Sequence, residues 1–227
     1  MMQKLRLGAA LFNGDHGRLA DEVARLEAAG LDFIHLDVFD GHFVPDLGFP
    51  PRTIAALRPL TKLPFEVHLG ATDPLRFVPH LVDAGTDLIV FHAESVTMLY
   101  EALFAVRDSG RDQGVQVGLA FGLGTSLTGL EPVITLVDAV LLLSRVTGEG
   151  ARGAAFNPLV LPRLRMVRTL AEAAGKTVDI QVAGGVNRTH VADLVAAGAT
   201  TLALGGGLYK VPDMAQEVDE IRKLAAG

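Results

Sequence analysis

The chain has no cysteine among its 227 residues, which excludes disulfide bonds, thiolate metal ligands and a cysteine nucleophile. It also has no excess of basic residues, since its formal net charge is −6. A broad basic surface for nucleic acid or an anionic membrane is therefore not expected, and any phosphate site should be local. No apolar run is long enough to cross a bilayer, and the first residues lack the apolar core of a signal peptide. These absences predict a cytoplasmic protein without nucleic-acid or membrane partners.

Linkers, low-complexity tracts and charge blocks are also missing, so nothing in the sequence divides the chain. Hydrophobic residues make up 49% of it, which excludes a disordered chain. A chain of this length can bury one substantial core. We therefore expect a single domain over residues 1–227.

A weak repeat indicates how that domain is built. Three helical patterns end in Ala-Gly shortly before an apolar strand pattern, and each glycine is a typical helix stop. Extending this alternation predicts strands at 6–12, 33–38, 65–70, 88–94, 115–121, 139–144, 179–185 and 201–207. Helical segments are expected at 18–29, 53–57, 74–84, 98–108, 130–136, 159–174, 191–197 and 214–224.

Alternating strands and helices in this number predict an α/β protein, a single (β/α)8 TIM barrel. The active site of such a barrel lies at the C-terminal ends of its parallel strands. An open, doubly wound sheet is the alternative. It is less favoured because no glycine-rich dinucleotide fingerprint follows the first strand.

Two of the predicted strands carry polar side chains on one face. His35 and Asp37 alternate with aliphatic residues in strand 33–38, and His68 does the same near the end of strand 65–70. Imidazole and carboxylate groups suit a first-row divalent cation. The alternative is that each histidine is a separate buried side chain with its own hydrogen bond. Because two strands repeat the pattern, we favour metal or acid-base chemistry.

Two glycine clusters end the last two strands. Gly184 and Gly185 close the seventh strand, and Gly205, Gly206 and Gly207 close the eighth. In a barrel these two loops commonly bind phosphate through exposed backbone N–H groups and a helix N-terminus. Tight turns without a ligand are the alternative for either cluster alone. The pair together favours a phosphorylated small molecule.

With these motifs in view, the chain resembles the ribulose-phosphate 3-epimerase family over almost its whole length. The family pattern His-x-Asp-x-x-Asp-Gly-His-Phe-Val-Pro stands here at residues 35–45. Its Val-His-Leu stands at 67–69 and its His-Ala-Glu at 92–94, and the two glycine clusters match its phosphate glycines.

This resemblance implies a barrel that inverts C3 of a phosphorylated sugar, a ketose phosphate, through a metal-stabilised enediolate. It assigns His35, Asp37 and His68 as ligands of a divalent metal, which we expect to be zinc, manganese or iron(II). It also implies that Asp37 is the catalytic base. Homo-oligomers are common in the family, so a homo-oligomer is expected here.

The chain departs from the family at the end of the seventh strand. The family reads Val-Asp-Gly-Gly there, whereas this chain has Ala183 in place of the aspartate. Epimerisation removes a proton from one face of a carbon and delivers one to the other, so the family uses two carboxylates. Ala183 can neither exchange a proton nor bind metal. Asp179 and Gln181 share its strand parity but should lie deeper, so neither is an obvious replacement.

The loop after the sixth predicted strand also differs from the family's substrate loop, because it is longer and charged. Gly150 in this loop is expected to contact the substrate phosphate. Arg145 and Arg152 could receive a second anionic group, and Glu149 could act as a replacement acid or ligand. Exposed charges in a variable loop are the alternative.

Three functions follow from these observations. The first is a metal-dependent epimerase of the ribulose-phosphate 3-epimerase type, whose second acid is unidentified. The second is an aldose-ketose sugar-phosphate isomerase, because a 1,2-proton shift can stay on one face and needs only the carboxylate of Asp37. The third is an inactive paralogue that binds a phosphorylated ligand. The retained His35, Asp37 and His68 favour the enzymes.

Overall fold

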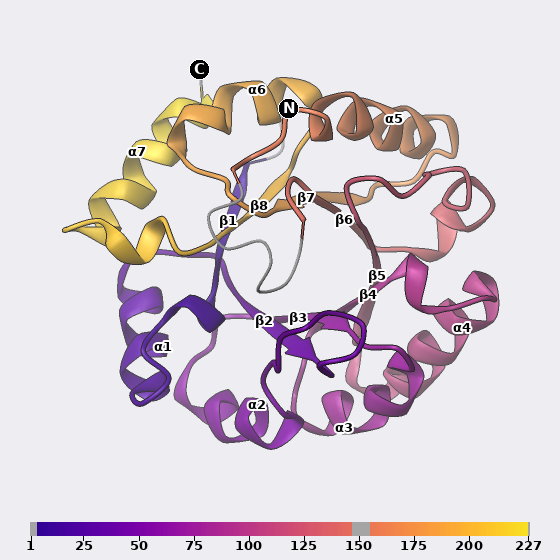
Figure 1. Ribbon diagram of the computed structural model, residues 1–227, viewed down its shortest axis with the longest axis horizontal. Helices are drawn as coiled ribbons and strands as arrows, with labels where there is room; N and C mark the ends of the chain where they lie inside the picture. The colour runs from indigo at the N-terminus through magenta and orange to yellow at the C-terminus, as the bar shows by residue number, and fades with distance from the viewer. Residues whose placement is uncertain (1–3, 147–154, 227) are drawn as a thin grey trace.

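The computed structural model describes residues 4–146 and 155–226 of the chain. Eight parallel strands form a closed barrel in sequence order, with the helices around its outside (Figure 1). The strands are β1 (Arg6–Ala10), β2 (Phe33–Phe39), β3 (Phe65–Gly70), β4 (Leu88–His92), β5 (Gln116–Phe121), β6 (Ala139–Leu143), β7 (Asp179–Ala183) and β8 (Thr201–Leu204). The predicted (β/α)8 barrel is therefore confirmed.

The helices and short 3-10 turns fill the predicted connections. The α-helices are α1 (Leu19–Ala28), α2 (Pro51–Leu57), α3 (Val78–Asp83), α4 (Leu99–Ser109), α5 (Val160–Ala173), α6 (Val191–Ala197) and α7 (Met214–Ala226). The 3-10 helices are η1 (Leu11–Asn13), η2 (Arg58–Leu60), η3 (Pro74–Phe77), η4 (Ala93–Ser95), η5 (Arg111–Gln113), η6 (Glu131–Leu136), η8 (Arg188–His190) and η9 (Leu208–Lys210). No helix in the described ranges is long and apolar enough to cross a membrane.

Two details differ from the sequence prediction. Several strands end earlier than predicted; β1, β4, β7 and β8 stop at Ala10, His92, Ala183 and Leu204, before the polar or glycine-rich residues that form the mouth of the barrel. The segment expected to be helical around 130–136 is the 3-10 helix η6, which has proline in its first turn and contains β-branched residues. The three Ala-Gly stops are confirmed, since Gly30, Gly85 and Gly198 all adopt positive φ.

Alternation along the strands divides the core into two layers. The outward-facing aliphatic residues of the strands pack under the helices in one large buried cluster. Inside the barrel, a separate small cluster joins Leu88, Val90, Ala120, Ala139, Leu141, Leu143, Ala183 and Ala203. These residues come from β4 to β8, whereas the inward faces of β2 and β3 carry polar groups. The interior thus combines this apolar cluster with ionisable side chains from β2 and β3.

Candidate active site

The side chains of His35, Asp37 and His68 meet inside the barrel. Parallel pairing sets Asp37 on β2 opposite His68 on β3, and both strands direct these residues inward. Asp37 Oδ1 lies 3.1 Å from His68 Nδ1 and 3.6 Å from His35 Nε2. One ligand atom from each residue lies within 4.8 Å of the others, as a metal site requires. The two histidines are buried, and the polar faces of the two strands converge on one point.

Two outer partners fix which ring nitrogens face the centre. Glu66 Oε1 lies 2.9 Å from His35 Nδ1, so that nitrogen donates its hydrogen to the carboxylate and leaves Nε2 with a lone pair. His68 Nε2 lies 2.9 Å from His92 Nε2, and His92 Nδ1 lies 3.1 Å from Glu94 Oε2. If His92 donates to Glu94, then His68 Nε2 donates to His92 and Nδ1 of His68 keeps its lone pair. Three electron-pair donors then face one point, which fits a divalent cation.

The same arrangement explains the protonation of the group. Burial lowers the pKa of His35, but the hydrogen bonds and charges of Asp37 and Glu66 outweigh it and raise the pKa to about 10. Burial lowers the pKa of His68 to about 4, because its contact with Asp37 offsets only part of the desolvation. Burial would raise the pKa of Asp37, but contacts with both histidines hold it below its usual range. A proton on His35 Nε2 and a metal cation are therefore alternatives, because each would bind the same electron pairs of His35 and Asp37.

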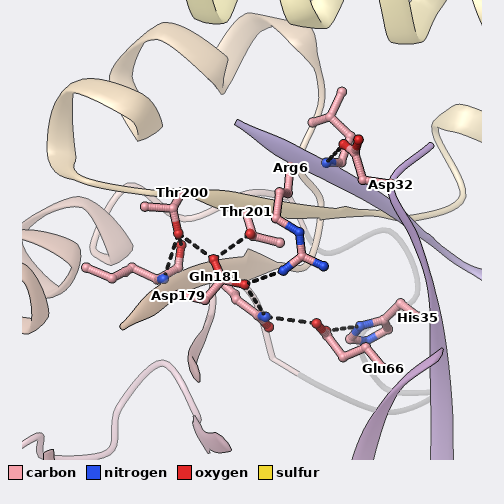
Figure 2. A network of polar contacts seen from close by, with 10 residues as sticks. Arg6, Asp32, His35, Glu66, Asp179, Gln181, Thr200 and Thr201 are labelled. Carbon is pink, nitrogen blue, oxygen red and sulfur yellow. Dashed lines mark hydrogen bonds and ion pairs between the residues drawn. The ribbon is translucent and has the colours of Figure 1, made fainter. Parts of the chain in front are cut away.

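Glu66 joins His35 to a polar network that crosses the barrel interior (Figure 2). Its second oxygen accepts a 2.8 Å hydrogen bond from Gln181 Nε2 on β7. The same Gln181 nitrogen donates to Asp179 at 3.0 Å, and Asp179 pairs with Arg6 at 2.9 Å. The hydroxyl groups of Thr200 and Thr201 also donate hydrogen bonds to the Asp179 carboxylate. The side chains of Gln181 and Asp179, below Ala183, are thus held by hydrogen bonds in the barrel floor, as predicted from their depth.

A cavity of about 670 Å³ opens above this floor. His35, Asp37 and His68 line its ionisable wall. Its apolar wall is formed by Leu143, Ala183 and Ala203. Ala183, in this apolar wall, is 9% exposed.

The glycine clusters form one end of the same cavity, together with Asn187. Gly184 and Gly185 have φ of 103° and 71°, a backbone region that residues with a Cβ rarely adopt. Asn187 caps the following helical turn, since its side chain accepts a 2.9 Å hydrogen bond from Thr189 N–H. Gly205 and Gly206 line the cavity directly. Backbone N–H groups beside a capped helical turn suit a phosphate group.

Some predicted residues are placed and others are not described. Arg145 lines the cavity, and its Cγ lies 2.8 Å from the point where a Cβ on Gly184 would stand. The other predicted loop residues, Glu149, Gly150 and Arg152, lie outside the described residues.

Sequence reasoning missed three polar residues of the cavity: Asn13, Asp46 and Lys210. Asn13 ends η1, and its side chain lies beside Gly206. Lys210 ends η9, three residues after the last glycine of the second cluster. Asp46 directly follows the stretch 35–45 that carried the motif analysis. Its place next to a motif was the only available signal, because loop paths are not periodic.

Comparisons with known proteins give one consistent relationship. The model of the ribulose-phosphate 3 epimerase family matches residues 6–209. The ribulose-phosphate 3-epimerase of Bacillus subtilis is 34% identical over 219 residues, covering 96% of this chain and 98% of the relative. The enzyme of the same name from Escherichia coli K12 is 32% identical over 222 residues, covering 97% and 96%.

Solved structures agree on the architecture. The crystal structure of KGPDC from Streptococcus mutans superposes with a TM-score of 0.70 at 13% identity, and 98% of each chain is covered. That of 3-hexulose-6-phosphate synthase gives a TM-score of 0.67 at 18% identity, covering 97% of this chain and 99% of the other. Identities this low show a shared barrel fold and leave the chemistry to the site itself.

Proposed function

The chain belongs to the ribulose-phosphate 3-epimerase family, and we propose that it inverts C3 of a ketose phosphate in the cavity at the mouth of its barrel. The observation that carries this proposal is one of placement. The His35, Asp37 and His68 group and the glycine clusters line the same cavity from different strands. A phosphate held by the glycines would present the sugar carbons to the carboxylate of Asp37.

A divalent metal fits the first group, because three electron-pair donors converge there and their outer partners leave the right nitrogens free. When bound, such a metal would act as a Lewis acid that stabilises the negative oxygens of an enediolate. Zinc, manganese and iron(II) all accept this ligand set. His35 and His68 would hold the metal, and Asp37 would share it while accepting the proton from carbon.

The remaining cavity residues bind, orient and exclude water. Backbone N–H groups at Gly184, Gly185 and Gly206 would hold the phosphate, and the cations of Arg145 and Lys210 lie along the same cavity. Leu143 and Ala183 present an apolar surface opposite the ionisable wall, which lowers the local dielectric around the reacting carbons.

The test follows D-ribulose 5-phosphate in heavy water by NMR after the purified protein has been loaded with zinc, manganese or iron(II). Formation of xylulose 5-phosphate with deuterium at C3 is the expected result. Absence of exchange with every metal and every ketose phosphate tried would contradict an active enzyme and leave an inactive phosphate-binding paralogue.

One observation favours a second candidate. Ala183 removes the carboxylate that the resemblance places on β7, and an aldose-ketose isomerase needs only one base because its 1,2-proton shift can stay on one face. Deuterium entering C1 together with an aldose product would support that isomerase over the epimerase in the same experiment.

We predict that Ala183→Asp increases metal affinity at least about tenfold, because a fourth protein ligand would complete the usual coordination of zinc. Ala183 lines the cavity, so the new carboxylate would extend into open space. Competition with a chromophoric zinc chelator measures the change. Ala183→Asn is the matched control of equal size without the charge. Equal affinity of the Asp and Asn variants would show that position 183 does not face the metal group.

A further inference from the structure

The proposed inversion of C3 needs a proton carrier on each face of the sugar, and this inference rests on that proposed function. Asp37 supplies one carrier from the inner face of β2. On β7, Ala183 supplies none, and the hydrogen bonds of Gln181 and Asp179 hold both side chains in the barrel floor. A second carrier therefore has to come from another part of the cavity.

Outside the three metal-type residues, the described ionisable side chains that line the cavity are Arg145, Lys210 and Asp46. A guanidinium does not exchange protons near neutral pH. Lys210 closely follows the second glycine cluster, where its cation would pair with the phosphate of the proposed substrate. Asp46 is the remaining group, and a carboxylate is the type of group that Asp37 already uses.

Backbone contacts hold the loop that carries Asp46 against the end of β2. Leu47 forms an antiparallel bridge with Asp40, and Gly48 N–H donates to the Phe39 carbonyl at 3.1 Å. Phe49 N–H then donates at 2.8 Å to the carbonyl of Asp37 itself. The chain thus leaves β2 and folds back along the end of that strand, beside β3, to the backbone of the residue that carries the first base (Figure 1).

Gly48 allows this close return. A Cβ at position 48 would stand 2.3 Å from Phe39 N and 2.4 Å from the Asp37 carbonyl oxygen. Only a residue without a side chain fits there. Val44, also in this loop, is 3% exposed and fixes the other side of Asp46. Asp46 therefore lies two residues after the buried Val44 and two residues before Gly48, whose backbone is bonded to β2.

Asp40, in the same loop, has a structural role and differs from Asp46 in its hydrogen bonds. Its oxygens accept hydrogen bonds from the N–H groups of His42, Phe43 and Thr72 and from the Thr72 hydroxyl. Within the described residues, no hydrogen bond or ion pair engages the Asp46 carboxylate. The Asp46 side chain is half-buried and lines the cavity.

We propose that Asp46 is the second proton-transfer residue, acting on the face of C3 opposite Asp37. In one direction the Asp37 carboxylate takes the C3 proton, and the C–H electrons form the C2–C3 double bond while the C2 carbonyl becomes an enediolate oxygen. Protonated Asp46 then gives its proton to the other face, and the C2 carbonyl re-forms. The two residues have exchanged protonation states, which exchange with water restores. In the reverse direction their roles are interchanged.

Asp46→Asn separates proton exchange from inversion. With D-ribulose 5-phosphate in heavy water, the variant should form xylulose 5-phosphate roughly 10²–10³-fold more slowly than the wild type. Deuterium should still enter C3 of the recovered substrate within about tenfold of the wild-type rate, because Asp37 still works on its own face. Asp73→Asn changes an exposed loop aspartate that does not line the cavity, and it should alter neither rate. A thermal unfolding curve confirms that each variant is folded.

Several outcomes would overturn the assignment. Inversion by Asp46→Asn within about threefold of the wild type would remove Asp46 from the reaction. An equal loss of exchange and inversion would place it in substrate binding instead. The same separation in Glu149→Gln, with Asp46→Asn unaffected, would assign the role to Glu149. A wild-type protein that neither exchanges nor converts the substrate would remove the proposed function as well, whereas the other results leave that function intact.

Discussion

Asp37→Asn should lower the rate of C3 proton exchange and of epimerisation together, roughly 10²–10⁴-fold, since a positioned general base contributes about that much. This corresponds to about 3–5 kcal/mol of transition-state stabilisation. Asn has nearly the same size and shape as Asp, but it cannot take a proton from carbon. Both rates come from the same heavy-water NMR experiment. The joint loss contrasts with Asp46→Asn, which should spare exchange.

Because Asp37 also belongs to the metal-type group, the experiment needs a variant that weakens the group without removing the base. His68→Ala is that control, since it deletes one imidazole of the group. Its activity should recover in part as the metal concentration is raised, whereas Asp37→Asn should stay inactive at every concentration. Full recovery of Asp37→Asn at high metal would contradict its role as base and leave it as a ligand only.

The parts of this site that were predictable lie on regular elements. Alternation with period two fixed the direction of His35, Asp37 and His68, and barrel geometry then required their strands to end on one side. The two glycine clusters followed from the same rule, because they terminate adjacent strands. For these residues, local pattern and global fold carry the same information.

The parts that were not predictable depend on contacts between distant or irregular segments. Gln181 reaches Glu66 across 115 positions of sequence, and no pattern along either strand indicates that pairing. Asp46 enters the cavity because Gly48 returns to the backbone of β2, and a loop path of this kind has no period to detect. From the sequence, Ala183 therefore indicates a site with only one carboxylate, Asp37. The structure places a second carboxylate, that of Asp46, in the same cavity directly after the motif.

Because the ionisable side chains inside the barrel are buried, they need hydrogen-bond partners in the barrel floor. His35 and Glu66 are each only 2% exposed, so water does not hydrate the imidazole ring or its carboxylate partner. Two carboxylates, Asp37 and Glu66, therefore lie on either side of one imidazole. Gln181 and the Asp179–Arg6 pair continue this alternation of donors and acceptors to the barrel floor. Stability and ligand geometry should consequently depend on the same residue, Glu66.

Glu66→Ala should lower the free energy of unfolding by about 3–5 kcal/mol, because it leaves a buried, charged partner of the pair without its counterpart. For a chain of this size the melting temperature should fall by roughly 6–20 °C. Metal affinity should fall about 10–100-fold as His35 loses the acceptor that orients it. Calorimetry of the metal-free protein and chelator competition measure the two effects separately.

Glu66→Gln and Glu27→Ala are the comparisons that give this prediction its meaning. Gln can still accept from His35 Nδ1, but its own amide N–H₂ would meet Gln181 Nε2, so its loss of stability should be intermediate. Glu27 is an exposed residue of α1, and removing it should change stability by no more than about 0.5 kcal/mol. A Glu66→Ala variant as stable as Glu27→Ala would mean that the His35–Glu66–Gln181 network contributes no net stability. Unchanged metal affinity in a destabilised variant would instead separate the barrel floor from the metal-type group above it.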